Sequence, residues 1–390
     1  MAKLIDITGK ALSGEWGTDD ETGKGIPVLR TTNFTNEGVV NYDNVVTRTI
    51  TKTNIQEKYL RPGDIILEKS GGSDKQPVGR VVFYDGPENT YLFNNFTGLL
   101  RVKNQSVWFP RFVFYSLFSN YNKGGTKTYE NKTTGLHNLK ADDYVARFEI
   151  PECNYTKQIT ICKQLDSILH IISLRKHQLA KLDDLIKARF VEMFGEPEVN
   201  PLGWKKESLI KHADVLVGYP FPSEGYSNDG IDIVGGYNLM QGFIQWKDSK
   251  HWPDVHGFEQ YLLQANDIVM AMDRPWVNGG FKIAQIDSSH LPALLIQRTA
   301  CIRGKGIEQE FLYHQLNSIR FAKHCNITGS LVPHISNKDI NSFLVILPPR
   351  DMQRKFVGFV AQVNRIKAFV QKALDETQLL FDSLMQEYFG

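Results

Sequence analysis

The stretch QITICKQLDSILHIISLRKHQLAKLDDLIKARFVEMFG, residues 158–195, decides the architecture of this chain. It has no Pro and no Gly before its last residue, so nothing interrupts a helix. Positions taken at alternating steps of four and three residues form one face, and eight of these ten are apolar: Ile161, Leu165, Ile168, Ile172, Arg175, Leu179, Leu182, Ile186, Arg189 and Met193. The spacing predicts a long helix over residues 156–195 with a seam that packs on a second helix.

The second helix is found by adding 195 to each residue number. Eight of the ten resulting positions are again apolar: Phe356, Val360, Val363, Lys367, Val370, Leu374, Thr377, Phe381, Leu384 and Tyr388. Prolines precede both segments, and Thr156 and Asp351 are the expected N-caps. Helices of this length span about 55 Å at 1.5 Å per residue, more than one small domain needs. A pair inside a bundle core is the alternative, but the matching seams favour a helix–helix pair.

The helix pair is expected to pack through one set of side chains from both segments. These are Ile161, Leu165, Ile172, Leu179, Ile186, Phe356, Val363, Leu374, Phe381 and Leu384.

Shorter matches upstream of each helix indicate that the whole chain is a tandem repeat. Residues 63–66 (Gly-Asp-Ile-Ile) correspond to 266–269 (Asn-Asp-Ile-Val), and Thr134-Gly135-Leu136 to residues 328–331 (Thr-Gly-Ser-Leu). Gln158 corresponds to Gln353, and each follows an apolar–Pro pair, Ile150-Pro151 and Leu347-Pro348. Each match is short, but all occur in the same order.

The segments before the two helices are predicted to be β-rich, with short helices near residues 109–120 and 310–321. We therefore expect four parts along the chain. They are a first domain at residues 1–155, a helix at 156–195, a second domain at 196–350 with a linker at 196–204, and a helix at 351–390.

Composition excludes several classes of protein. With 390 residues and 42% hydrophobic content, the chain can bury two or three cores. No apolar run is long enough to span a bilayer, so a cytoplasmic location is expected. Four cysteines without a Cys-x-x-Cys pair predict neither disulfides nor a zinc site.

The charge is small but unevenly distributed. The net charge is +2, which argues against a self-sufficient DNA binder. Residues 101–140 carry seven Lys or Arg against Glu130 alone, and residues 288–338 carry six against Glu308 and Glu310. A solvated basic face explains either segment alone; two at matching places favour contact with nucleic acid.

Catalytic motifs are largely missing from the sequence. No Gly-x-x-x-x-Gly-Lys-Ser/Thr phosphate loop, Asn/Asp-Pro-Pro-aromatic motif or Gly-rich methyl-donor loop occurs, so no cofactor is expected in this chain. Asp232, Asp248 and Lys250 have the spacing of a metal-dependent nuclease, but this pattern is short and common by chance. This pattern is the basis for one alternative function, a metal-dependent nuclease or fused restriction protein. A coiled-coil adaptor unrelated to DNA is a third, which the basic segments and polar loops disfavour.

Polar loops supply the candidate DNA-contacting residues, because Arg, Lys, Gln, Asn and Ser are the side chains that read base edges. For any one of them an ordinary loop role is more common, so the segments are the firmer prediction. The candidates are Lys69, Ser73, Lys75, Gln76, Arg80, Asn95, Lys127, Tyr129, Lys132, Thr133, Arg274, Trp276, Arg298 and Ser330.

Taken together, these motifs resemble the specificity subunits of type I restriction–modification enzymes. The resemblance covers the whole chain, and residues 200–204 (Asn-Pro-Leu-Gly-Trp) are similar to the entry of a second recognition domain in that family. It implies an α+β fold in which two pseudo-repeated β-rich target-recognition domains are separated by two long antiparallel coiled-coil helices. The chain departs from the pattern at Leu4-Ile5-Asp6, where the first domain lacks the Gly-Trp entry, so its opening strand is expected to be short or to pair differently from its counterpart in the second domain.

The resemblance also implies a function and partners. Each domain would read one half of a bipartite site in double-stranded DNA, without catalysis by this chain. The helices would dock two methylation subunits, which bind S-adenosylmethionine, and motor–nuclease subunits would join them.

Overall fold

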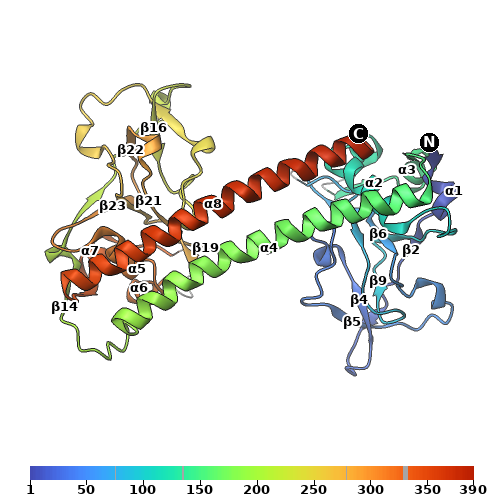
Figure 1. Cartoon of the computed structure of the whole chain (residues 1–390), viewed down its shortest axis with the longest axis horizontal. Coiled ribbons are helices and arrows are strands. Elements are labelled where there is room, and N and C mark those ends of the chain that lie inside the picture. The colour runs from blue at the N-terminus through green and yellow to red at the C-terminus, as the bar shows by residue number, and fades with distance from the viewer. Residues whose placement is uncertain (75, 134–135, 278, 328–332) are drawn as a thin grey trace. The chain divides into compact units, whose positions relative to one another are not determined.

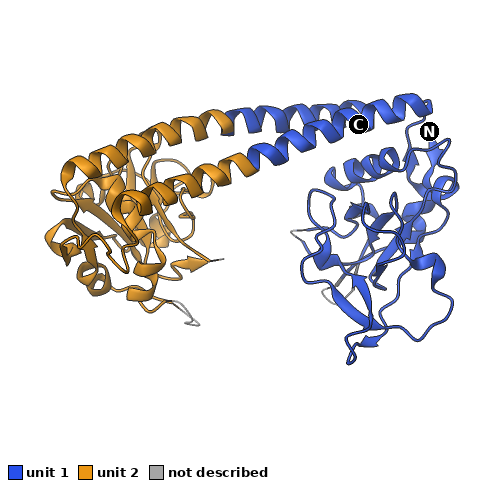
Figure 2. Cartoon of the chain, turned by 60° about the horizontal axis from the view of Figure 1, so that its bottom comes forward, with its two compact units in different colours: residues 1–176, 371–390 blue, residues 177–370 orange. Residues whose placement is uncertain are grey.

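The chain divides into two compact units, coloured separately in Figure 2. The computed structural model describes residues 1–390 except 75, 134–135, 278 and 328–332. Unit 1 comprises Met1–Lys176 and Gln371–Gly390, and unit 2 comprises His177–Val370. Each unit therefore contains half of each long helix. The sequence-based boundaries of two separate recognition domains stay a prediction.

The long helices are α4 (Tyr155–Phe194) and α8 (Arg350–Phe389), green and red in Figure 1. Their ends lie within one residue of the expected ones, but both predicted N-caps are wrong. Asn154 caps α4, because its side-chain oxygen accepts a hydrogen bond from the Lys157 backbone N–H at 2.8 Å. Helix α8 starts directly after two prolines, and the Pro349 carbonyl accepts from the N–H groups of the first turn. Thr156 and Asp351 lie one step inside the helices.

In unit 1, the start of α4 packs against the end of α8. The buried seam residues there are Ile161, Leu165, Ile168, Ile172 and Phe381, with Leu374 and Leu384 packed against them. The Tyr388 hydroxyl donates to the Gln164 side-chain oxygen at 3.2 Å.

In unit 2, the end of α4 packs against the start of α8. Ile186, Phe356 and Val363 are buried in one cluster, and Lys367 pairs with Asp183. Leu179 is half-buried. Within each unit the two helical segments therefore run antiparallel.

The sheets of unit 1 have strand orders β2-β10-β6-β8, β3-β5-β4-β9, β11-β12-β7 and β1-β13. All of their strand pairs are antiparallel except β4 with β9. The bounds are β1 Ala2–Lys3, β2 Leu12–Ser13, β3 Thr18–Asp19, β4 Ile26–Leu29, β5 Val46–Thr49, β6 Ile65–Glu68, β7 Ser70–Gly72, β8 Val81–Phe83, β9 Leu92–Phe93, β10 Thr97–Leu100, β11 Glu130–Thr133, β12 Leu136–Leu139 and β13 Glu149–Ile150.

Unit 2 repeats three of these sheets, one of them with a strand fewer, in the orders β15-β23-β18-β21, β17-β16-β22 and β14-β24, and its described residues form a further hairpin, β19-β20. The parallel pair recurs between β16 and β22. The opening strand β14 has three residues where β1 has two, as the sequence led us to expect. The bounds are β14 Lys206–Ser208, β15 Ala213–Val217, β16 Ile231–Val234, β17 Lys250–Trp252, β18 Ile268–Ala271, β19 Trp276–Val277, β20 Gly280–Phe281, β21 Ile283–Gln285, β22 Ala293–Leu295, β23 Thr299–Gly304 and β24 Leu344–Ile346.

The central strands β6 and β18 are apolar on both faces because each lies between two cores. Side chains alternate across a strand, so Ile65 and Leu67 enter one core of unit 1 while Ile66 enters another. In β18, Ile268 and Met270 enter the core that contains the long helices. Because both faces of these strands are buried, two consecutive apolar residues follow the repeated Asp, at positions 65–66 and 268–269.

Shorter helices cover the sheets: α1 (Leu4–Thr8), α2 (Pro110–Asn122), α3 (Ala141–Arg147), α5 (Gln309–Leu316), α6 (Ile319–His324) and α7 (Asn337–Ser342). The single helix predicted over 310–321 is wrong. The backbone leaves the helical region at Asn317, and Ser318 caps a new helix by accepting from the Phe321 N–H at 3.3 Å. Among the described residues, no helix is both long and apolar enough to cross a membrane.

Candidate nucleic-acid interface

Three separate segments meet beside the central strand of unit 1. Strand β7 pairs with β12, which pairs with β11, so the polar loop that begins after β6 lies against strand β12. The backbone N–H groups of Lys69 and Ser70 donate to the Phe96 carbonyl at 2.8 and 3.1 Å. The fold thus gathers the segments that carry the unit 1 candidates.

Unit 2 gathers the corresponding segments, and one of its backbone bonds is equivalent to the Lys69–Phe96 bond of unit 1. The Met272 N–H donates to the Arg298 carbonyl at 2.9 Å, and the Arg274 N–H donates to the Pro333 carbonyl at 3.0 Å. Asp273 forms a β-bridge with His334. The two units therefore present equivalent loop clusters.

Several unit 1 candidates are exposed at this cluster. Ser73, Asn95 and Lys127 are exposed. Gln76 is half-buried and its amide donates to the Asn36 oxygen at 2.8 Å. Lys69 donates to the Ser13 hydroxyl at 3.0 Å, and partial burial holds its pKa below the ordinary value.

Arg80 is occupied within the protein. Its guanidinium donates to both Glu68 carboxylate oxygens, at 2.9 and 3.1 Å, and to the carbonyls of Thr31 and Phe34. Only one of five donors is left, so we assign Arg80 to positioning the loop.

The other unit 1 candidates fall into three groups. Tyr129 is half-buried and packs edge-on against Tyr144, with ring centroids 5.3 Å apart. Lys132 and Thr133 belong to β11. Lys75 lies outside the described residues, as does Ser330 of unit 2.

The remaining unit 2 candidates lie near Asp273. Arg274 is exposed and has a positive φ of 45°. Arg298 pairs with Asp273 at 2.9 Å, yet 73% of its side chain stays exposed. Trp276 packs edge-on against Phe281 at 5.0 Å across the β19-β20 hairpin.

Two histidines beside these clusters were not predicted. His137 contacts the Glu130 carboxylate, and His334 contacts the Asp273 carboxylate. His137 follows Gly135 by two residues and His334 follows Gly329 by five, so the only sequence signal for them is that each lies a few residues after a repeated Thr-Gly pair.

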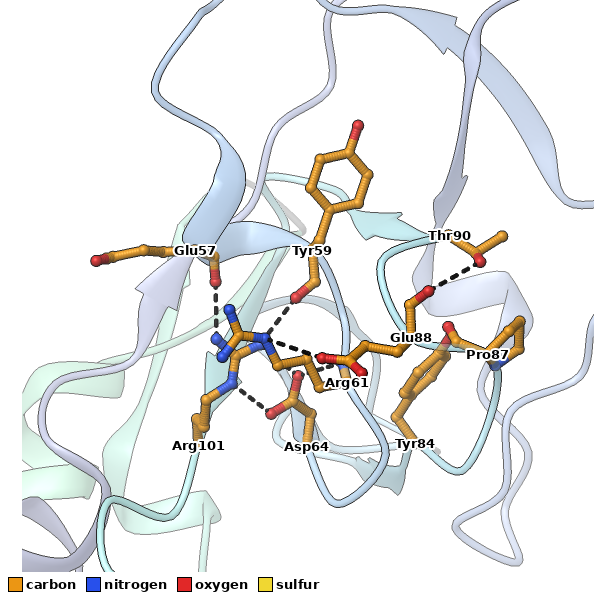
Figure 3. Close-up of polar contacts among 9 residues, drawn as sticks. All are labelled: Glu57, Tyr59, Arg61, Asp64, Tyr84, Pro87, Glu88, Thr90 and Arg101. Carbon is orange, nitrogen blue, oxygen red and sulfur yellow. Dashed lines mark hydrogen bonds and ion pairs between the residues drawn. The ribbon is translucent and has the colours of Figure 1, made fainter.

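A buried Asp–Arg clasp occurs in both units, and Figure 3 shows the one in unit 1. In unit 1, Arg101 donates two hydrogen bonds of 2.7 Å to Asp64, whose side chain is almost fully buried, and others to the carbonyls of Glu57 and Tyr59. In unit 2, Arg303 makes the same two bonds to Asp267. This explains why the Asp recurs in both halves.

These contacts weaken the charge argument drawn from the sequence. Besides Arg101, Arg111 is paired with Asp166. In the second basic segment, Arg303 is in a clasp and Lys323 pairs with Glu198. Part of the clustered positive charge is therefore paired with acidic side chains of the same chain.

The repeated glutamines also have one shared role. The Gln158 oxygen accepts from the Phe109 N–H at 2.8 Å, and the Gln353 oxygen accepts from the Glu308 N–H at 2.9 Å. Phe109 and Glu308 are the residues just before α2 and α5. Each buried glutamine thus joins a long helix to the start of a shorter one.

The nuclease-like pattern is not assembled as a site. Asp232 faces His251 across β16 and β17 at 3.3 Å, whereas Lys250 lies over the rings of Tyr226 and Tyr237. Neighbouring residues of a strand point to opposite faces, which separates Lys250 from Asp232. Within the described part of the chain, no group of three or more His, Cys, Asp or Glu could hold a metal ion.

Large apolar side chains are exposed on both long helices in repeated positions. Adding 195 relates Ile171 to Ile366, Leu174 to Phe369 and Leu185 to Leu380, and their exposed fractions lie between 41% and 74%. Exposed apolar residues of this size are typical of protein interfaces.

Comparison with known proteins gives three curated relatives. The EcoAI specificity subunit of Escherichia coli is 33% identical over 230 residues, which cover 56% of this chain and 39% of that protein. The MjaVIII specificity subunit of Methanocaldococcus jannaschii is 22% identical over 76% of this chain and 75% of its own length. The EcoBI specificity subunit of Escherichia coli is 28% identical over 43% of this chain and 35% of that protein. The chain thus matches about two-fifths of the length of the first of these relatives. All three are specificity subunits of type I restriction enzymes.

Solved structures match the fold over the whole chain, although no family model matches the sequence. One is a chain from a type I R-M system studied for complex assembly and conformational transition, with TM-score 0.57, 15% identity and 96% of that chain covered. Another is the S subunit of a type I system from M. genitalium, with TM-score 0.56, 16% identity and 95% covered. The resemblance to type I restriction enzyme specificity subunits is therefore confirmed, since this chain is similar to them in sequence and has their fold.

Proposed function

We propose that this chain is the DNA-recognition subunit of a type I restriction–modification complex, and that each unit reads one half of a bipartite site in double-stranded DNA. The observation that carries the proposal is the doubled loop cluster. An equivalent backbone bond joins the polar loops around Lys69 and Phe96 in unit 1 and those around Met272 and Arg298 in unit 2.

Base reading would come from the exposed polar side chains of these clusters. Asn95 and Arg298 lie on equivalent turns, and Asn and Arg are suited to adenine and guanine edges. Because the net charge is only +2, most phosphate contacts would come from other subunits. Two reading units on antiparallel helices, which we propose form a coiled-coil spacer, would fix the distance between half-sites.

The helices would also dock two methylation subunits, and motor–nuclease subunits would join the assembly. The hydrogen bonds between the helices indicate an antiparallel register in which Ile171 lies across from Leu380, and Leu185 lies across from Ile366. These exposed apolar positions support two equivalent docking patches. The first patch, of Ile171, Leu174 and Leu380, lies in unit 1. The second, of Leu185, Ile366 and Phe369, lies in unit 2. S-adenosylmethionine would bind to the methylation subunits, and this chain would hold no cofactor and no catalytic residue.

Sequencing of methylated sites tests the proposal. The chain is expressed with its methylation subunit in cells that lack other such systems. We expect one bipartite motif with an unread spacer of constant length. Methylation at a single continuous motif, or none that depends on this chain, would refute it.

The nuclease alternative is tested separately by incubating the purified chain with supercoiled plasmid and Mg²⁺. We expect no nicking, and no difference between the chain and its Asp232→Ala variant. Cleavage lost in that variant would establish the alternative.

A further inference from the structure

The turn after β22 in unit 2 corresponds to the turn after β9 in unit 1. In each turn the hydroxyl of a buried threonine, Thr97 or Thr299, donates to the carbonyl three residues earlier. Arg298 therefore occupies the position of Phe96. Phe96 is 53% exposed, and 73% of the Arg298 side chain is exposed. The two units thus share the bonds that anchor this turn but present different side chains on it.

The backbone of Arg298 is held in an unusual conformation. Its φ of 61° lies in the left-handed region, which residues with a side chain rarely adopt, whereas Phe96 has no positive φ. The Gln297 N–H donates to the Tyr219 carbonyl at 2.8 Å. The Met272 N–H donates to the Arg298 carbonyl at 2.9 Å, so the turn is held from two sides. Backbone strain of this kind is concentrated at functional sites.

The Arg298 guanidinium contacts a single carboxylate. Its Nη1 lies 2.9 Å from Oδ2 of Asp273, and Oδ1 of Asp273 contacts Nδ1 of His334. Neither Nε nor Nη2 of Arg298 donates a hydrogen bond to any described residue. An exposed ion pair adds little to folding stability, but it restrains the direction in which the free N–H groups point.

A guanidinium restrained in this way matches the major-groove edge of guanine. Guanine presents the acceptors O6 and N7 side by side, and two N–H groups of one arginine bind both. A carboxylate at a surface that contacts DNA otherwise repels the phosphates, so its contact with Arg298 explains the position of Asp273. The Phe96 side chain has no N–H group, so unit 1 lacks this arrangement.

We propose that Asp273 is a positioning residue that holds Arg298 for bidentate recognition of one guanine in the half-site read by unit 2. The inference rests on the proposed function, because it needs DNA at the unit 2 loop cluster. His334 restrains the Asp273 carboxylate in turn. The half-site read by unit 1 has no guanine recognised from the equivalent position.

The experiment uses the full chain assembled with its methylation subunits, and duplexes that carry the motif found by sequencing of methylated sites. Each guanine of the motif is replaced in turn by 7-deazaguanine, which lacks the N7 acceptor, and the Kd is measured by fluorescence anisotropy. Arg298→Ala, Asp273→Ala and Asp273→Asn are compared with the unchanged chain. Arg274→Ala is the matched control, since it removes another exposed arginine from the same loop cluster.

We expect the replacement of one guanine to weaken binding of the unchanged chain at least about fivefold, since one of two base contacts is lost. Arg298→Ala should bind the natural motif about tenfold more weakly and lose this sensitivity. Asp273→Ala should lose most of the sensitivity but keep its affinity for unrelated DNA, and Asp273→Asn, which retains an oxygen acceptor, should recover it. Arg274→Ala should weaken binding to the natural and substituted duplexes by the same factor.

The inference is overturned if no guanine of the motif shows the effect, or if 7-deazaguanine affects Arg298→Ala as much as the unchanged chain. Full sensitivity in Asp273→Ala overturns the positioning role, and a base preference changed in that variant alone would mean that Asp273 contacts a base itself. Because most of the Arg298 side chain is exposed, we expect Arg298→Ala to fold, and its melting temperature checks this. The proposed function fails separately, if no bipartite methylated motif depends on this chain.

Discussion

At the residue scale, the repeat preserves contacts rather than surface chemistry. Asp64 and Asp267 were found from short matches, and each holds an arginine in a buried clasp. The sequence could show that these residues recur. It could not show that Arg101 is paired with Asp64, because that contact joins residues 37 positions apart.

The clasp predicts that Arg101→Leu destabilises unit 1 by about 3–5 kcal/mol, because Asp64 would be left buried without its partner. The change is measured by urea unfolding followed by intrinsic fluorescence. Arg61→Leu is the control, since Arg61 is half-exposed and lies 3.8 Å from Glu88. Equal losses in both variants would show that the clasp has no special role.

The buried glutamine makes a second residue-scale prediction. Gln158→Leu removes bonds to the Phe109 N–H and to the carbonyls of Val107 and Cys153, so the free energy of unfolding should fall by about 2–4 kcal/mol. Gln371→Leu, on the exposed side of α8, should change it by less than about 0.5 kcal/mol. A loss at Gln158 as small as the control would argue against the anchor.

At the element scale, the long helices could be predicted because their signal is local and repeats over many turns. Their ends were found within one residue, yet both caps were misplaced, since a cap depends on one side-chain bond. The break between α5 and α6 was missed because apolar residues recur at helical spacing on both sides of Asn317. The candidate DNA contacts were taken mainly from polar loops. The sequence could identify these segments, but not which of them lie next to one another, because that depends on how the strands pair.

The two faces of the helices should respond differently to the same substitution. Leu165→Asp places a carboxylate in the unit 1 core and should lower the melting temperature by well over 5 °C. Leu174→Asp lies on the exposed face and should leave the melting temperature within about 1 °C while it weakens partner binding. Scanning calorimetry and native mass spectrometry separate the two effects. The reverse pattern would mean that the seam is assigned to the wrong face.

At the scale of the whole molecule, we propose that the long helices hold two reading units at a fixed distance. An insertion of four residues lengthens a helix by about 6 Å, close to the length of two base pairs. Insertions after Ala180 and after Asp375 should therefore lengthen the unread spacer by one or two base pairs and keep the bases at each end. Sequencing of methylated sites gives the spacer. A fully active variant with its original spacer would show that the helices do not set the distance.

The central claim, that each unit reads its own half-site, is tested most directly by domain exchange. Residues 1–153, which end between β13 and α4, are replaced by the same segment of a relative that has a different target. Methylated sites are then sequenced in cells that also express the methylation subunit. We expect one half of the motif to change, while the other half and the spacer stay the same. A motif that changes in both halves, or in neither while the exchanged segment is present and folded, would contradict it.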